Sequence, residues 1–403
     1  MDARATSEAL SLAEKVEEFL QGFPLGFDHL DVSVRRRLSE ATRKLSLATE
    51  STGDTVHRVV HSPLQLPLTL VGIETRLFEI LAEQKHDGDT NAELARKTKV
   101  DSTLMKRLLR YYQSFGMIDQ PGDDQYRANN ITQAMVSLGG RAGVPFYLGT
   151  LVPAFNALPQ FLRDTGYANI TDGANCPWFL GHRTDEAPFD WVQKRPDMMQ
   201  NFMSWMVSQR DGLPNFLEVI DFVKEFAQNS DDSIPIFVDI GGAMGHQSIS
   251  LRQKYPELVG RVILQDLPQV IDRVKVSPLL GFEGIEAQVY NFFTEQPLKG
   301  ARNYYLRNVL HGWPDHTCVE ILQNIKPAMK KESKILIDEM VLPERGAPWR
   351  ATQVDLAMST CFAAMERSHA DWIALLDKAG LKIERVWKYT EQVDDCIIVA
   401  IPK

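Results

Sequence analysis

The sequence predicts an α/β protein whose second half forms a doubly wound parallel sheet, preceded by a largely helical region. Three observations predict this fold class. From Ile234 onward, apolar strand-like segments alternate with segments of helical spacing. A glycine-rich turn joins the first of these strands directly to a helix. The last two strands are separated only by residues 391–394, so they must pair as an antiparallel hairpin.

The bulk properties exclude several classes of protein. The chain has 403 residues, enough for two or three domains with a sizeable core. Its formal net charge of −9 argues against broad nucleic-acid binding, because neutralising phosphates requires clustered Lys and Arg. The N-terminal segment is rich in charged residues, and no run of about 18 apolar residues occurs. We therefore expect a cytoplasmic protein with neither a nucleic-acid nor a membrane partner.

The cysteines indicate a reducing compartment. Cys176, Cys318, Cys361 and Cys396 are far apart and show no paired spacing. This pattern predicts reduced core thiols, not a disulfide framework or a zinc site. No metal is expected.

Residues 1–65 are expected to form N-terminal helices that contribute to a dimer. Apolar side chains recur at helical spacing over residues 7–23 and again over residues 31–50. Each such helix has one apolar face that must pack against something. A partner subunit and the remainder of the same domain both satisfy this requirement, and the sequence leaves the two open.

Residues 66–140 are predicted to form a winged-helix domain. The expected helices cover residues 69–83, 91–97 and 101–115, and the wing consists of strands at 116–119 and 125–127 around a turn at 121–124. Such a domain can bind DNA, here with Lys106, Arg107 and Arg110 on the recognition helix. A solvated helix face or a dimerisation scaffold fits the acidic chain and its large second domain better.

Residues 141–230 are predicted to be a mostly helical connector that lines a substrate pocket. An apolar stripe in this region contains Met203, Trp205 and Met206. Stripes of this kind usually belong to a core, but one that precedes a nucleotide-binding domain can also wall a pocket. With Met358 and Phe362, these side chains are our candidate pocket lining. They favour an apolar, aromatic or polyketide-like substrate.

Residues 231–403 are predicted to carry the sheet. Strands are expected at residues 234–239, 261–265, 287–292, 302–308, 333–341, 382–389 and 395–401. The helices between them are expected at residues 246–255, 268–275, 315–330 and 369–379. A parallel sheet that ends in an antiparallel hairpin is typical of class I methyltransferases, whereas NAD-binding sheets usually lack the hairpin. The G-x-G-x-x-G spacing of NAD-dependent oxidoreductases is also not met.

A nucleotide site is predicted at the carboxyl ends of the first three strands. Gly241, Gly242 and Gly245 follow Asp239 and allow the backbone to approach a ligand closely. Asp266 follows the second strand, where an acid commonly meets ribose hydroxyls. At the end of the third strand, Asn291 is expected to bond an adenine edge and Phe292 to stack on it. A simple strand-end cap is the alternative for that pair.

Three further residues are predicted to meet at the same edge. His311 follows the fourth strand, Glu339 is expected to end the fifth, and Glu366 precedes the last helix. Methyl transfer from a sulfonium to oxygen needs a base, and a neutral imidazole with a pKa near ~6.5 can accept the proton. Neighbouring carboxylates orient the ring and stabilise the imidazolium that forms.

With these motifs in place, the chain resembles the fungal branch of the plant caffeic-acid-type O-methyltransferase family. The similarity runs from about Pro67 to the C-terminus. It rests on Val-Asp-Ile-Gly-Gly-Ala-Met-Gly-His at 238–246, Gln-Asp-Leu-Pro at 265–268, Leu-Ile-Asp-Glu-Met-Val-Leu-Pro at 336–343, and the segments 302–313 and 355–367.

The resemblance implies S-adenosylmethionine as cofactor, S-adenosylhomocysteine as product of methylation, and a homodimer built by a winged-helix domain. By position, His311 matches the catalytic base of the family, and Glu339 and Glu366 match its flanking carboxylates. Leu267 and Arg307 lie within matched motifs and are counted with the cofactor-binding residues.

Three departures from the family pattern are visible. Ala243 replaces a glycine of the turn, Asn291 replaces an aspartate that contacts adenine, and Gly312 replaces the aspartate that follows the base. Some fungal relatives bind S-adenosylmethionine without transferring its methyl group and act as pericyclases in natural-product biosynthesis. A secondary-metabolite O-methyltransferase is our first prediction, and a pericyclase on the same fold is the alternative.

Overall fold

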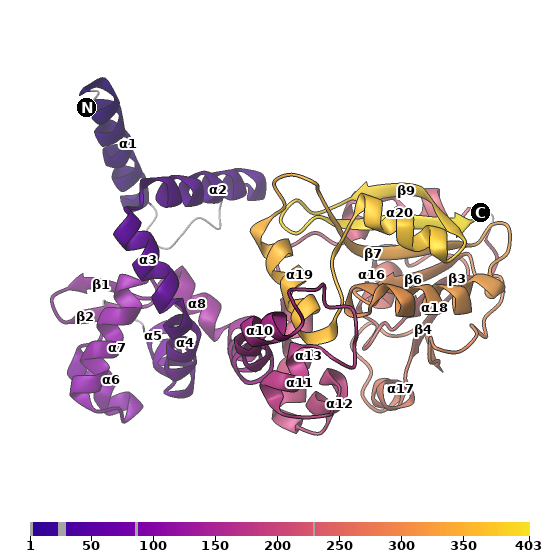
Figure 1. The fold of residues 1–403 in the computed structure, drawn as a ribbon, viewed down its shortest axis with the longest axis horizontal. Coiled ribbons are helices and arrows are strands. Elements are labelled where there is room, and N and C mark those ends of the chain that lie inside the picture. Colours follow the sequence, from indigo (N-terminus) through magenta and orange to yellow (C-terminus); the bar gives the residue numbers. More distant parts are fainter. Residues whose placement is uncertain (1–2, 23–29, 85–87, 229) are drawn as a thin grey trace. The chain divides into compact units, whose positions relative to one another are not determined.

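The computed structural model describes residues 3–22, 30–84, 88–228 and 230–403 of the chain (Figure 1). The chain divides into two compact units. One contains residues 1–150 and 193–211, and the other contains residues 151–192 and 212–403. The finer division into four parts that the sequence suggested stays a prediction.

The first unit begins with three helices, α1 (Ala3–Gln21), α2 (Val32–Thr49) and α3 (Thr52–His61). Asp31 caps α2 by accepting the amides of Ser33 and Val34, and Ser51 caps α3. The two predicted N-terminal helices are confirmed within the described residues, while the predicted end of the first at residue 23 lies outside them. No residue of α2 or α3 is buried.

The predicted winged helix is present in the same unit. It consists of α4 (Gln65–Glu74), α5 (Leu77–Ala82), α6 (Asn91–Thr98), α7 (Ser102–Ser114, capped by Asp101), β1 (Asp119–Gly122) and β2 (Gln125–Arg127). The single helix expected over residues 69–83 is wrong, because Arg76 has a left-handed φ of 59° that separates α4 from α5. The first wing strand also begins three residues later than expected. Met117 and Ile118 are core residues that precede it.

The connector is helical, as predicted. The first unit holds α8 (Asn130–Val136), α9 (Leu138–Phe146) and α13 (Pro196–Ser208), with a π-helical turn at Tyr147–Leu151 where the units meet in sequence. The second unit holds α10 (Val152–Asp164), α11 (Pro177–His182), α14 (Phe216–Val219), α15 (Phe222–Phe226) and all but the last residue of α12 (Pro188–Gln193).

The second unit is organised by the predicted sheet. Its strands are β3 (Pro235–Ile240), β4 (Arg261–Asp266), β5 (Ile285–Val289), β6 (Asn303–Arg307), β7 (Lys334–Leu342), β9 (Leu381–Lys388) and β10 (Asp395–Pro402), in the spatial order β5-β4-β3-β6-β7-β10-β9. The first five run parallel. β10 lies between β7 and β9 and is antiparallel to both, so the C-terminal hairpin is confirmed.

Helices cover this sheet and connect its strands (Figure 1). They are α16 (His246–Lys254), α17 (Pro268–Val276), α18 (Asp315–Ile325) and α20 (His369–Lys378). A further helix, α19 (Trp349–Phe362), follows β7 and packs against α10 and α11. On β6, the side chains of Tyr304 and Leu306 belong to the main core, which also contains apolar residues of α18 and α20. Tyr305 faces the opposite side, against Phe237 and Phe216. The alternation along a strand thus buries both faces, as parallel sheets require.

Three sequence expectations in this unit need correction. β5 ends at Val289, so Asn291 and Phe292 lie beyond the strand. The helix expected over 315–330 ends at Ile325 and continues as a 3₁₀ turn at Lys326–Ala328, where Pro327 cannot supply an amide. Helix α19 was not foreseen, because its residues lack a clear apolar stripe.

All four cysteines are buried and none is in a disulfide, as predicted for core thiols. Among the described residues, we find no helix both long enough and apolar enough to cross a lipid bilayer.

Candidate active site

The glycine turn after β3 has the close backbone approach that its sequence predicts. Gly241 and Gly245 have φ angles of 69° and 82°, in the region that favours glycine. A Cβ on Gly242 would lie 2.5 Å from Cγ of Asp239, so no side chain fits there. Gly245 then caps α16, whose first amides point toward the turn. The turn therefore presents bare backbone at the carboxyl edge of the sheet.

Two acidic residues flank this turn. Asp239 is buried and accepts a 2.9 Å hydrogen bond from Ser248 Oγ, and burial raises its pKa to about 7. Asp266 ends β4 and accepts the amides of Ala243, at 2.8 Å, and Leu267, at 2.7 Å. Burial also raises the pKa of Asp266. Each Asp266 oxygen keeps a lone pair for a further donor, as a ribose-binding acid needs.

The structure brings Phe292 next to the glycine turn. A Cβ on Gly241 would lie 3.9 Å from the Phe292 ring, which packs edge-on against Phe293 and Trp313. Asn291 is exposed, and its side-chain oxygen accepts the amide of Phe293 at 3.0 Å. This is the strand-end cap that the sequence left open, and the Asn291 oxygen can still accept a second donor.

Arg307, at the end of β6, is committed to an internal ion pair. Its Nη1 lies 3.1 Å from Asp338 Oδ2, and the hydroxyls of Tyr305 and Tyr389 donate to the same carboxylate. Burial alone lowers the pKa of Arg307, but the Asp338 charge outweighs it and raises the pKa well above its usual value. Arg307 also acts electrostatically on Asp239 beneath the turn. A direct cofactor contact of Arg307 stays a prediction.

His311 lies in a short 3₁₀ turn, Leu310–Gly312, just after β6. Its side chain is 17% exposed. Nδ1 lies 2.6 Å from Glu366 Oε1 and 4.0 Å from Glu339 Oε2. The three residues predicted to meet at this edge do meet there, from three separate segments of chain.

The Glu339 carboxylate binds the backbone of the Leu310–Gly312 turn and also lies near the His311 imidazole. Its Oε1 accepts the amides of Leu310 at 2.9 Å and His311 at 3.3 Å. It is 1% exposed, and burial raises its pKa to about 7, with the Glu366 charge adding to the rise and His311 opposing it. Glu339 does not end its strand, since β7 continues to Leu342. The register pairs Arg307 with Asp338, so Glu339 is the first β7 residue beyond the end of β6.

Glu366 reaches the site through a short strand, β8 (Arg367–Ser368), which pairs with the end of β7. Its amide donates to Asp355 Oδ1 of α19 at 2.9 Å. Ser368 then caps α20. The parallel pairing of β8 with β7 brings Glu366 beside Glu339, although 26 residues separate them in sequence.

Arg367, which the sequence did not single out, supports the turn that carries His311. Its side chain is 0% exposed. Its guanidinium donates to the carbonyls of Leu310, at 3.1 Å, and Trp313, at 3.2 Å, and pairs with Asp315 Oδ1 at 2.9 Å. It therefore clamps both ends of the turn that carries His311. Its adjacency to Glu366 was the available signal, but sequence alone did not show which carbonyls it would meet.

The predicted pocket residues lie in both units. Met358 and Phe362 are half-buried on α19, where the Phe362 ring packs 5.5 Å from that of Phe189. Met203, Trp205 and Met206 lie on α13 of the first unit, where Trp205 packs edge-on against Tyr147. Lining of a common pocket by these five residues stays a prediction.

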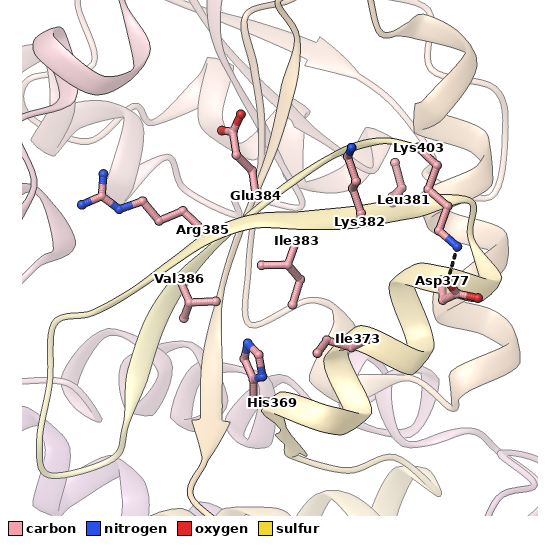
Figure 2. A pocket seen from close by; sticks show the side chains of 10 residues that line it. All are labelled: His369, Ile373, Asp377, Leu381, Lys382, Ile383, Glu384, Arg385, Val386 and Lys403. Carbon is pink, nitrogen blue, oxygen red and sulfur yellow. Dashed lines mark hydrogen bonds and ion pairs between the residues drawn. The ribbon is translucent and has the colours of Figure 1, made fainter.

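A separate cavity of about 490 Å³ lies along α20 and the edge strand β9 (Figure 2). Charged side chains line much of it, among them Lys382, Glu384 and Arg385, and an ion pair joins Lys403 to Asp377. The β9 residues that line the cavity lie toward the start of that strand, near the amino ends of the parallel strands. His311 lies at the opposite end of the sheet, beyond the carboxyl ends of the strands. Charged side chains are the usual protection of an edge strand. We therefore do not assign the substrate to this cavity.

Comparison with known proteins agrees with this geometry. Residues 170–382 match the O-methyltransferase domain family. The chain is 38% identical over 366 residues to O-methyltransferase lepI of Aspergillus flavus, covering 91% of this chain and 93% of that protein. It is 35% identical over 369 residues to demethylsterigmatocystin 6-O-methyltransferase of Aspergillus parasiticus, covering 92% and 93%.

Solved structures give the same result. A structure of LepI in complex with SAM (S-adenosylmethionine) superposes with a TM-score of 0.88 at 35% identity, covering 99% of this chain and 100% of that one. A structure described as a pericyclic reaction enzyme also superposes with a TM-score of 0.88 at 35% identity, covering 98% and 100%. The chain belongs to the S-adenosylmethionine-dependent O-methyltransferase family.

Proposed function

We propose that this chain transfers the methyl group of S-adenosylmethionine to a hydroxyl oxygen of an apolar, aromatic or polyketide-like secondary metabolite. The observation that carries the proposal is the 2.6 Å contact between His311 Nδ1 and Glu366 Oε1. A carboxylate at Nδ1 keeps the ring proton on that nitrogen, so Nε2 remains an acceptor. The imidazole is thereby prepared to remove the proton of a hydroxyl group.

The residues around the glycine turn fit the cofactor. Gly241 and Gly242 leave the backbone uncovered, Asp266 keeps acceptor capacity for ribose hydroxyls, and the Phe292 ring lies beside the turn. When bound, S-adenosylmethionine supplies a methyl group on a positively charged sulfur. S-adenosylhomocysteine is the expected product.

The carboxylates around His311 support its role as base. Once the ring accepts a proton, it carries a positive charge at a site with little water, where Glu366 and Glu339 stabilise it. General-base catalysis of this kind contributes about 10²–10⁴-fold to a rate. Arg367 keeps the turn in place while this charge appears and disappears.

The test is a product assay on the purified chain. Candidate phenols and polyketides are incubated with S-adenosylmethionine, and S-adenosylhomocysteine is measured together with the mass of the organic product. The proposal expects both S-adenosylhomocysteine and a product one methyl group heavier. Turnover of a substrate without S-adenosylhomocysteine would contradict it.

A pericyclase is the second candidate function, and two observations favour it. The structural relative described as a pericyclic reaction enzyme has the same fold. In addition, a Cβ on Gly312 would meet no heavy atom within 4 Å among the described residues, so space is open beside His311 where the family carries an acid. In such a reaction, His311 would move a proton during dehydration, and the shaped pocket would orient the intermediate. The same product assay separates the two functions.

We also infer a homodimer formed through α1, α2 and α3. Their large apolar side chains are exposed, among them Val56, Val59 and Val60 of α3 at 56%, 57% and 61%. An isolated helix gains little stability in water without a packed apolar face. A second copy of the chain would cover these side chains. The cytoplasm is the compartment we propose, in line with four buried thiols that form no disulfide.

A further inference from the structure

We propose that His311, Glu339 and Glu366 also form a binding site for a zinc-type divalent cation, and that the bound cation switches the base off. One ligand atom from each side chain lies within 4.8 Å of the other two. The set contains one imidazole nitrogen and two carboxylate oxygens. These are ligands that Zn²⁺ and Co²⁺ bind well, and a catalytic-type zinc site commonly has three protein ligands with a fourth position open.

A second observation points to a ligand. Glu339 is 1% exposed, and its Oε2 accepts no hydrogen bond from any described residue. Its other oxygen is held by the amides of Leu310 and His311, which fix the orientation of the carboxylate. Oε2 is thereby directed toward the ring, 4.0 Å from Nδ1. A buried acceptor without a donor is costly, and a cation would satisfy it.

Electrostatics favour a cation at this position. Two carboxylates lie at one imidazole with little water to screen them, and the Glu366 side chain is 1% exposed. Arg367 is the nearby cation, but its guanidinium is directed at the carbonyls of Leu310 and Trp313 and at Asp315. The 17% exposure of His311 leaves a route for an ion to enter.

Binding at Nδ1 would change the chemistry of the ring. With the ring proton on Nδ1 and donated to Glu366, as in the proposed function, Nε2 is the acceptor. A cation on Nδ1 takes the lone pair of that nitrogen, so the single ring proton must reside on Nε2. The imidazole then presents a donor where the substrate hydroxyl needs an acceptor. The cation therefore inhibits proton removal while the cofactor turn at Gly241–Gly245 is left untouched.

The experiment measures metal binding without cofactor or substrate, so its result does not depend on the proposed function. Co²⁺ is titrated into the purified chain and its visible absorption recorded, and Zn²⁺ affinity is obtained by competition with a chromophoric chelator. The variants are Glu339→Gln and Glu366→Gln, with Glu344→Gln, an exposed residue outside the site, as the matched control. Mg²⁺ serves as the control ion, because it prefers oxygen ligands in octahedral geometry.

We expect one Zn²⁺ per chain, a Co²⁺ spectrum of low coordination number, and at least a ~10-fold loss of affinity in both site variants but not in Glu344→Gln. Thermal melting and S-adenosylhomocysteine binding establish that each variant is folded. Equal Zn²⁺ affinity in the wild type and both folded site variants would overturn the proposal, as would the absence of stoichiometric binding in the wild type. Where methyl transfer is measurable, Zn²⁺ should abolish it and a chelator should restore it.

Discussion

Glu339 contacts His311 twice, through the backbone and through space: Oε1 accepts the His311 amide at 3.3 Å, while Oε2 lies 4.0 Å from the His311 ring nitrogen Nδ1. One carboxylate thus fixes where the base lies and contributes to the field that the base experiences. The two roles can be separated with Glu339→Gln. The glutamine side-chain oxygen can still accept the backbone amides of Leu310 and His311, but the side chain carries no charge.

Replacing His311 tests the base directly. We expect His311→Asn to lower the rate of methyl transfer by about 10²–10⁴-fold, because the general base is lost. S-adenosylmethionine affinity should stay nearly unchanged, since the glycine turn and Asp266 lie elsewhere. Single-turnover kinetics and calorimetry measure the two quantities. A collapse of cofactor affinity would show that His311 is structural.

The buried carboxyl of Glu339 should make stability depend on pH. Its pKa rises from 4.5 to about 7 in the folded chain, chiefly through burial, so the folded state holds a proton that the unfolded state releases. Its contribution to stability is therefore fully present below pH 4.5 and is lost as the pH rises toward 7.

Glu339→Gln removes this titration while keeping the acceptor for the two amides. From pH 4.5 to pH 8, the unfolding free energy of Glu339→Gln should rise relative to wild type, by on the order of 3 kcal/mol at most. Urea denaturation at several pH values provides the measurement. A difference independent of pH would mean that Glu339 titrates normally.

Arg367 should matter for both stability and rate. Arg367→Met removes a buried guanidinium and leaves the carbonyls of Leu310 and Trp313 without this donor. We expect a loss of about 3–5 kcal/mol in unfolding free energy, and a lower kcat in the folded fraction with little change in cofactor affinity. Asp315→Asn is the control, because Asp315 is 44% exposed and its pairing should contribute about 1 kcal/mol or less.

Ala243 offers a backbone test of the glycine turn. It has a φ of 51°, a left-handed conformation that costs an alanine about 1–2 kcal/mol. Glycine removes that strain and costs about 0.5–1 kcal/mol in chain entropy, so Ala243→Gly should be neutral or stabilising by up to about 1 kcal/mol. Ala374→Gly, in the exposed interior of α20, should instead destabilise by about 1 kcal/mol. The melting temperatures of the two variants, measured by thermal denaturation, should therefore shift from that of the wild type in different directions or by clearly different amounts.

The exposed face of α3 tests the homodimer. Val56→Asp combined with Val59→Asp places two charges on that face, which should yield monomers if a second copy covers it. Ser39→Asp, at an exposed polar position of α2, is the control. Sedimentation velocity at several concentrations reports the assembly. A wild-type chain that sediments as a monomer at every concentration would contradict the dimer.

The strand order along the chain, the C-terminal hairpin and the location of the nucleotide turn could all be predicted from the sequence. These features follow from local chemistry: apolar runs form buried strands, glycines allow left-handed turns, and the short connection between Lys388, which ends β9, and Asp395, which begins β10, permits only antiparallel pairing. His311, Glu339 and Glu366 were also identifiable, because each follows or borders a predicted strand or helix.

How these residues act on one another depends on the folded structure and could not be predicted from the sequence. The insertion of β10 between β7 and β9, the pairing of β8 with β7 and the burial of Glu339 depend on contacts between distant segments. The raised pKa of Glu339 follows from that burial. The pairing of β8 with β7 places Arg367, whose guanidinium donates to the carbonyls of Leu310 and Trp313. Sequence periodicity reports which face of a segment is apolar, whereas hydrogen-bond partners and desolvation are set by which segments meet in space.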